Sequence, residues 1–169
     1  MGDDLPAGWQ QRVDEAWASF DERSNDDNAA LFDQLANELP AGSPVGWFER
    51  ASVQDATGHE DLAVPLYRQA LELGLGGDRR RQAVIQLASS LRTLGRADES
   101  VAMLIDEAAA DSDELDDAVR AFLALALVDL GREREAVSLA LGALASHLPR
   151  YRRSVADYAR LLVAPDDPA

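Results

Sequence analysis

Histidines and clustered carboxylates are the side chains of this sequence whose types could support catalysis or metal binding. His59 directly follows a glycine, and His147 lies near the end of a predicted helix. Neither histidine has a second histidine or a glutamate at the spacing that places two metal ligands on one helix face. Both are therefore interpreted as surface or helix-capping residues.

Two acidic segments share only their composition with metal-binding loops. Residues 21–27 fail the pattern of a calcium loop, because Arg23 and Asp26 stand where an oxygen ligand and a glycine belong. Residues 111–117 are better explained as helix caps, since serine and aspartate accept hydrogen bonds from the first N–H groups of a helix. The chain has no cysteine and no phosphate-binding glycine loop. The sequence thus predicts no catalytic residue, no metal site and no cofactor, in a protein that is not an enzyme.

Net charge restricts the partners of this protein. The formal net charge is −15, every basic residue is an arginine, and residues 1–49 alone carry a net charge of −9. A negative field of this size repels phosphate groups, which disfavours nucleic acid and anionic membranes and permits a basic protein or peptide as partner. Arginine in place of lysine and the richness in alanine indicate a GC-rich genome.

No segment of the sequence has the character of a membrane anchor or a leader. The longest strongly apolar run, residues 121–128, is much shorter than the about 20 residues that span a bilayer. The N-terminal stretch MGDDLPAGW has neither the basic region nor the apolar region of a signal peptide. We therefore expect a soluble, cytoplasmic protein.

Three glycines mark an internal repeat. Gly58, Gly95 and Gly131 follow one another at intervals of 37 and 36 residues, which is the range of helical repeat arrays. Each glycine is flanked by two segments with the spacing of amphipathic helices, and no segment alternates as a strand would. The sequence therefore predicts an all-α protein built from helix–turn–helix repeats.

Small residues recur where the two helices of each repeat would face each other. One set precedes each glycine by the same interval, and one set follows it: Ala51, Ala88 and Ala124, and then Ala63, Ser100 and Ala136. Two antiparallel helices can approach closely only where side chains are small. We therefore expect these residues at the helix–helix contact of each repeat.

The flanking segments complete the predicted domain organisation. Residues 1–42 form an acidic helical pair, whose first helix carries Trp9, Val13, Trp17 and Phe20 on one face. Residues 43–163 hold three repeats, at about 44–77, 78–112 and 113–149, and a capping helix over 150–163. Residues 164–169, with two prolines and two aspartates, are expected to be disordered.

The repeat resembles the tetratricopeptide repeat. Trp47, Ala51, Gly58, Ala63 and Tyr67 match its aromatic, small and turn positions. The chain is most similar to a bacterial tetratricopeptide subfamily with stretches such as AVPLYRQAL, LASSLRTLGR and AVRAFLALAL. The resemblance implies a right-handed α-solenoid that serves as a protein-interaction scaffold.

Departures from the family pattern are also present. Arg50 stands where a leucine is expected, and the repeats are longer than usual. The proline that normally ends a repeat is missing from the first two repeats, and Pro149 comes one place late.

The spacing of charges predicts contacts between successive repeats. Arg80 and Arg81 precede Asp116 and Asp117 by 36 residues, and Arg152 and Arg153 follow the same acids by 36 residues. Arginines at a helix start oppose the helix dipole, so a nearby carboxylate would compensate them. We expect Arg80 or Arg81 to contact Asp116 or Asp117, and Arg152 or Arg153 to contact one of the same two aspartates.

In an array of this kind, the first helices of successive repeats line a concave surface. The register counted from the glycines places ten residues there: Phe48, Ser52, Asp55, Ile85, Ser89, Arg92, Ala121, Leu125, Val128 and Asp129. The mostly apolar lining would suit a peptide or an amphipathic helix of a partner protein. The alternative is that the N-terminal helical pair or a second copy of the chain covers this surface, in which case the protein acts through self-association as a homodimer.

Overall fold

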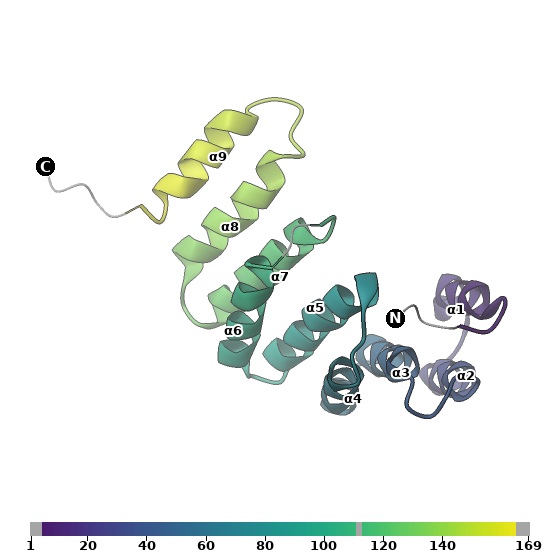
Figure 1. The fold of residues 1–169 in the computed structure, drawn as a ribbon. Coiled ribbons are helices and arrows are strands. Elements are labelled where there is room, and N and C mark those ends of the chain that lie inside the picture. Colours follow the sequence, from purple (N-terminus) through teal and green to yellow (C-terminus); the bar gives the residue numbers. More distant parts are fainter. Residues whose placement is uncertain (1–4, 111–112, 165–169) are drawn as a thin grey trace, which may run out of the picture. The chain divides into compact units, whose positions relative to one another are not determined.

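The computed structural model describes residues 5–110 and 113–164 and forms two compact units, residues 1–90 and 91–169 (Figure 1). Over the described residues it contains helices and no strand, which confirms the predicted all-α class. The α-helices are α1 (Trp9–Ala18), α2 (Asn25–Asn37), α3 (Pro44–Ala56), α4 (Glu60–Glu72), α5 (Gly77–Thr93), α6 (Ala97–Ala108), α7 (Asp116–Asp129), α8 (Glu133–Ala145) and α9 (Arg152–Leu161).

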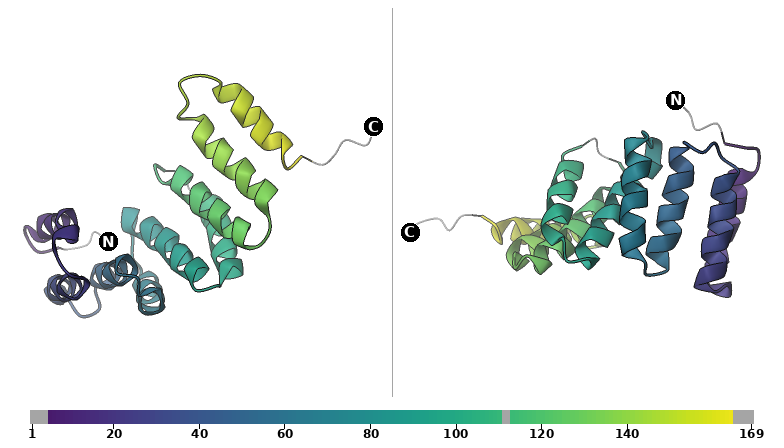
Figure 2. Two further views of the ribbon diagram at one scale, coloured as in Figure 1. Left: turned by 180° about the vertical axis from the view of Figure 1, so that it is seen from behind. Right: turned by 90° about the horizontal axis from the view of Figure 1, so that it is seen from below.

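In the first unit, α1 packs against α2, α2 against α3 and α3 against α4 (Figure 2). The predicted N-terminal stripe lies in the core: Trp9 and Val13 are fully buried, and Trp17 is half-buried. The indole Nε1–H of Trp9 donates to the carbonyl of Leu35 at 2.8 Å and so fastens α1 to α2. The helical pair therefore shares a core with the first repeat.

The first helix is shorter than the apolar spacing suggested. It ends at Ala18, and Phe20–Glu22 form a 3-10 turn that redirects the chain into α2. The buried amide of Asn28 donates to the Phe20 carbonyl at 2.9 Å and accepts from Arg23 Nε at 2.8 Å. Ser24 then caps α2, since its hydroxyl accepts from the N–H of Asp27.

The six small residues predicted at helix–helix contacts are all buried, with Ala51, Ala63 and Ala88 fully so. A larger side chain at these positions would push two packed helices apart. The prediction from the repeat register is confirmed at these positions.

The three repeat glycines each end a helix in the left-handed conformation. Gly58, Gly95 and Gly131 have φ of 79°, 76° and 70°. The residue after each glycine donates its N–H to a carbonyl five residues back at 2.9 Å, as in the Schellman motif. The turns therefore satisfy carbonyls that the helix itself leaves unpaired.

Substitution of Gly58 by alanine is expected to lower the free energy of unfolding by about 1–2 kcal/mol, the cost of an L side chain in the left-handed region. A Cβ at this position would meet no heavy atom within 4 Å, so the cost comes from the backbone alone. Gly58→Asn should cost less, because asparagine tolerates this conformation. Urea unfolding of both variants measures the difference, and equal losses would contradict a purely conformational cause.

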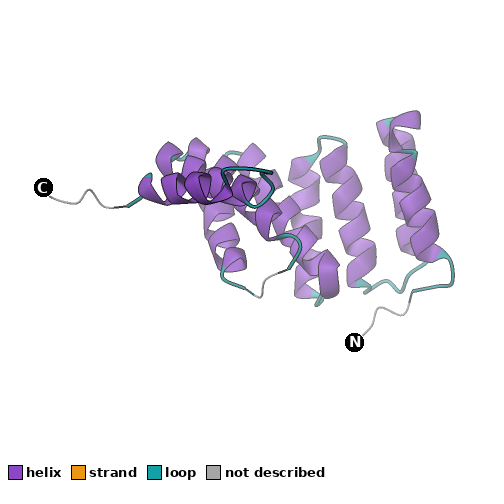
Figure 3. Ribbon diagram, turned by 90° about the horizontal axis from the view of Figure 1, so that it is seen from above, coloured by secondary structure: helices purple, strands orange, loops and turns teal. Residues whose placement is uncertain are grey.

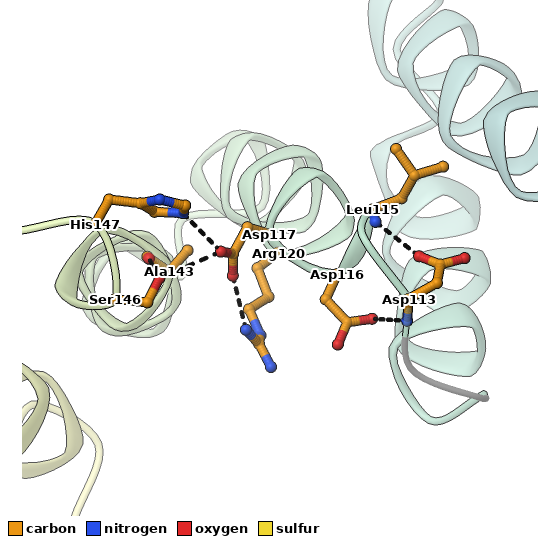
Figure 4. A network of polar contacts seen from close by, with 8 residues as sticks. All are labelled: Asp113, Leu115, Asp116, Asp117, Arg120, Ala143, Ser146 and His147. Atoms are coloured by element: carbon orange, nitrogen blue, oxygen red, sulfur yellow. Dashed lines mark hydrogen bonds and ion pairs between the residues drawn. The ribbon is translucent and has the colours of Figure 1, made fainter.

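In the second unit, α6 packs on α7, α7 on α8 and α8 on α9. The helix α7 starts at Asp116 and Asp113 precedes it, with its carboxylate accepting from the N–H of Leu115 at 2.7 Å (Figure 4). Residues 111 and 112 of the predicted capping segment and residues 165–169 of the predicted disordered tail lie outside the described residues. None of the described helices, coloured purple in Figure 3, is long and apolar enough to cross a membrane.

Asp117 takes other partners than the charge spacing suggested. Its carboxylate contacts His147 Nε2 at 2.9 Å and Arg120 at 2.8 Å, and the Ser146 hydroxyl donates to it at 3.4 Å (Figure 4). The His147 contact is the main cause that lowers the Asp117 pKa. Within the described part of the second unit, neither Arg152 nor Arg153 pairs with Asp117, and Arg152 donates to the Leu148 carbonyl instead. The pairing was predicted with either Asp116 or Asp117, and for Asp116 it stays a prediction.

Candidate functional site

The first unit contains an open pocket of about 760 Å³ lined mainly by three helices. The helices α1, α3 and α5 supply the walls, so the pocket uses the N-terminal pair as well as the first two repeats. The lining residues are Leu5, Gln10, Val13, Asp14, Trp17, Phe48, Glu49, Ser52, Asp55, Ala56, Asp78, Arg79, Gln82 and Gln86.

Four carboxylates and one guanidinium make the pocket acidic. Asp14, Glu49, Asp55 and Asp78 line the pocket, and Arg79 is the one cation among its described lining residues. No group of three or more carboxylates or histidines with the arrangement of a metal site is present in the described residues. The pocket is thus a negatively charged surface with an aromatic wall at Trp17 and Phe48.

Glu49 is the most buried charged group of the pocket, with 3% of its surface exposed. One carboxylate oxygen accepts from the indole Nε1–H of Trp17 at 3.2 Å, and the other lies 3.8 Å from Arg79 Nε, which is longer than a hydrogen bond. Burial raises the pKa of Glu49, and Asp14 adds to this effect, whereas Trp17 and Arg79 act in the opposite direction. The negative charge of Glu49 is therefore only partly compensated within the protein.

Trp17 is held in place by two rings. Its indole stacks on Phe20 at a centroid distance of 5.3 Å and contacts Phe32 at 4.4 Å. These contacts join α1 to the 3-10 turn and to α2, and they aim the indole N–H at α3. The N-terminal helical pair thus sets the position of Trp17, the hydrogen-bond donor to Glu49.

A hydroxyl and amide network forms another part of the pocket. The Ser90 hydroxyl donates to Asp55 at 2.8 Å, and the side-chain oxygen of Gln86 accepts from the hydroxyls of Tyr67 and of Ser52, the latter at 3.1 Å. Burial raises the pKa of Asp55, with the Ser90 contact acting against it. These contacts fix α5 against α3 and α4 without placing a cation next to Asp55.

Three of the ten residues predicted for the concave surface, Phe48, Ser52 and Asp55, line this pocket. From α5, Ile85 is buried and Ser89 is half-buried, while Gln82 and Gln86 reach the pocket. Gln82 and Gln86 follow Phe48 and Ser52 by 34 residues, whereas the register counted from the glycines uses 37.

The difference in register has a structural cause. The helix α5 has 17 residues and α3 has 13. More residues therefore separate Gln82 from Gly95 along the chain than separate Phe48 from Gly58. The Ser52–Gln86 hydrogen bond joins two residues that are 34 positions apart, so it follows the 34-residue interval.

The remaining predicted residues belong to the second unit. Arg92 forms an ion pair with Asp129 at 2.7 Å. Ala121 is exposed, and Leu125 and Val128 are about half-exposed, on the helix α7. These three side chains are apolar, and the two charged residues of the predicted set pair with each other.

The residues from α1 were not predicted as part of a site. The apolar spacing predicted Val13 and Trp17 only as part of one apolar helix face, and coverage of the concave surface by the N-terminal pair was an open alternative. The structure places Gln10, Val13, Asp14 and Trp17 in the wall of the pocket. Their spacing of three and four residues could have indicated one helix face with both polar and apolar side chains. The sequence spacing does not indicate which other helices this face meets.

The raised pKa of Glu49 gives a prediction for stability against pH. Because folding raises this pKa, the contribution of Glu49 to stability is fully present below the pKa of the unfolded chain and is lost as the pH rises through the folded value. Glu49→Gln keeps an acceptor for Trp17 and removes the charge, so it should be more stable than the original protein at pH 7.5. The gain should shrink as the pH falls through the folded pKa of Glu49, and it should be lost once the pH is below the unfolded value of about 4.3.

Glu38→Gln is the matched control for this pH prediction. The hydrogen bond with Arg12 lowers the pKa of Glu38. The contribution of Glu38 to folding stability is therefore present above the pKa of the unfolded chain and is lost as the pH falls through the folded value. The two variants should therefore depend on pH with opposite signs in thermal unfolding experiments. A Glu49→Gln gain that grows toward acid pH would contradict the assigned direction.

Comparisons with known proteins agree with the helical repeat architecture. A family model described as tetratrico peptide repeat matches residues 44–162. The chain is also similar to the solved structure of a putative kinesin light chain with nearly identical TPR-like repeats from Podosopora anserina. That similarity has a TM-score of 0.68 and 18% sequence identity, and it covers 94% of this chain and 88% of the other. The comparison with curated proteins found no match.

The structural similarity, at this low identity, shows the fold alone. The family model covers most of the chain, including every helix from α3 to α9. The chain therefore belongs to the tetratricopeptide repeat family.

Proposed function

We propose that this protein is a non-catalytic interaction module that binds a segment of a partner protein in the pocket of its first unit. Tetratricopeptide repeats generally mediate protein–protein interactions. The observation that carries the proposal is the pocket itself, whose volume of about 760 Å³ is large enough for several side chains of a peptide. Its walls combine apolar contacts with convergent polar groups, as binding sites commonly do.

The supporting residues come from helices rather than from loops. Phe48 and Val13 contribute apolar groups to the lining, and the amide of Gln82 supplies polar groups for the backbone of an extended peptide. Helices hold side chains more rigidly than loops do, which reduces the entropic cost of binding. This combination supports binding of a peptide.

A peptide-display selection on the intact chain tests this proposal. Gln82→Trp places a large side chain at the pocket wall and should remove binding of the selected peptides. Leu62→Trp is the matched control, because Leu62 is exposed on α4 and does not line the pocket. Selected peptides that bind Gln82→Trp as tightly as the original protein would contradict the proposed site.

A second candidate function, self-association, is favoured by the exposed face of α9. Tyr151, Tyr158 and Leu161 are 75%, 68% and 63% exposed, and their spacing of seven and three residues puts them on one side of the helix. Exposed apolar groups of this kind mark contact surfaces. Light scattering over a concentration series tests this candidate: a constant mass of 18.3 kDa would exclude it, and a dimer lost in Tyr158→Glu would support it.

A further inference from the structure

We propose that the pocket of the first unit binds a positively charged side chain, arginine or lysine, of the partner segment. This inference rests on the proposed function and specifies the chemistry of the bound residue. It is argued from the charges of the pocket, from the cation that the pocket already holds and from the walls that would contact the rest of the side chain.

The lining residues carry more negative than positive charges, which favours a cationic ligand. Four carboxylates and one guanidinium, Arg79, are among the described lining residues, and Arg79 Nε lies 3.8 Å from the carboxylate of Glu49. The hydrogen bonds to Asp55 and Asp14 come from neutral donors, the Ser90 hydroxyl and the Gln10 amide, both at 2.8 Å. A ligand with a positive charge would meet carboxylates on both α1 and α3, whereas an anionic ligand would be repelled.

Arg79 indicates how a guanidinium fits this site. Its side chain enters the pocket from α5 and donates to the side-chain oxygen of Gln10, while its Nε faces the carboxylate of Glu49. The pocket thus accommodates a planar cation between α1 and α3. The carboxylate of Asp55 lies on the same helix as Glu49, nearly two turns further on, and offers a second position for a charged group.

The walls suit the aliphatic part of arginine or lysine. Val13 and Phe48 are apolar, and Trp17 presents an indole whose N–H is engaged by Glu49. Long basic side chains bury their methylene groups along apolar surfaces and keep the charge at a polar end. Charge and shape therefore favour the same class of side chain.

The indole N–H signals of the three tryptophans allow a direct test by NMR. Trp17 donates to Glu49 at the pocket, whereas Trp9 donates to the Leu35 carbonyl in the core and serves as internal reference. The probes are two acetylated pentapeptides, Gly-Ala-Arg-Ala-Gly and the same peptide with citrulline, which has nearly the same shape and no charge. A lysine peptide is the third probe.

We expect the arginine and lysine peptides to shift the Trp17 signal in a saturable way, and the citrulline peptide to leave it in place. The shift should diminish with added salt and be lost in the double variant Asp14→Asn, Asp55→Asn, whose fold is checked by the unchanged Trp9 signal. Arg79→Gln, which removes the resident cation, should strengthen binding of the arginine peptide. Equal shifts with citrulline, or no shift with either cationic peptide, would overturn the inference.

The display selection separates failure of this inference from failure of the proposed function. Selected peptides that need the pocket but contain no basic residue would overturn the charge preference and leave the proposed function standing. Selected peptides that are indifferent to Gln82→Trp would overturn the proposed function. Basic peptides that lose binding in the Asp14→Asn, Asp55→Asn variant would support both.

Discussion

Replacement of Trp9 by alanine is expected to lower the free energy of unfolding by about 3–5 kcal/mol, the usual cost of removing a large aromatic core side chain. Trp9 is fully buried, and it is the residue whose N–H ties α1 to the Leu35 carbonyl of α2. The substitution therefore removes both apolar contact and a buried hydrogen bond. Urea unfolding followed by circular dichroism at 222 nm measures the loss.

Two controls separate the contributions in this prediction. Trp9→Phe keeps most of the apolar surface and removes only the N–H donor, so its cost should be nearer the about 1–3 kcal/mol of an unsatisfied buried group. Trp47→Ala removes an indole of the same size from a half-buried position and should cost less than Trp9→Ala. If Trp9→Ala were as stable as Trp47→Ala, the described packing of α1 would be wrong.

The loss of Trp9 should also affect the pocket. The helix α1 supplies Asp14 and Trp17 to the wall, and Trp9 is one of its main anchors to the rest of the unit. A loosened α1 would release the Trp17 indole from Glu49, and the Trp17 N–H signal should move toward the position of an unfolded chain. The pocket should thus be lost at urea concentrations that leave the packing of α3 on α4 intact.

Substitution of Ala63 by leucine has the second largest expected effect, a loss of about 1–3 kcal/mol from over-packing. Ala63 on α4 and Ala51 on α3 are fully buried in the first unit, where these two helices pack together. The extra carbon atoms could be accommodated only by separating the helices. The shift of the urea midpoint in equilibrium unfolding measures this effect.

The controls for Ala63→Leu use the same chemistry elsewhere. Ala30→Leu adds an equal volume on the exposed surface of α2 and should change stability by about 0.5 kcal/mol or less. Ala63→Ser keeps the side chain small and should cost less than leucine, since it adds a single polar atom. An Ala63→Leu variant with the stability of Ala30→Leu would show that the helices are not in close contact at this position.

The sequence by itself determined the helical repeat and its local chemistry. Glycine is the residue that adopts a positive φ without strain, so Gly58, Gly95 and Gly131 could be assigned to helix ends before the structure was known. Small residues at fixed intervals around the glycines likewise indicated the closest helix–helix contacts, because both features depend on a few neighbouring residues. The resemblance to the tetratricopeptide repeat drew on the same positions.

The composition of the pocket was decided by the tertiary structure. A count from the glycines placed Ile85 at the concave surface, but α5 is one turn longer than α3 and presents Gln82 and Gln86 instead. Glu49 gave no sign in the sequence of being buried, since its burial depends on Trp17 of a helix more than 30 residues away. The partners of Asp117 likewise depend on packing, since its carboxylate contacts His147, which follows α8, and Arg120 on its own helix.

These differences have one physical reason. Turns and close contacts are fixed by backbone conformation and side-chain volume, which each residue carries with it. The partner of a charged side chain depends instead on distances between helices that packing sets, and a shift of one helical turn changes it. The sequence therefore determined the repeat and the acidity of the first 49 residues, whereas only the folded unit brought Asp14, Glu49 and Asp55 to one pocket.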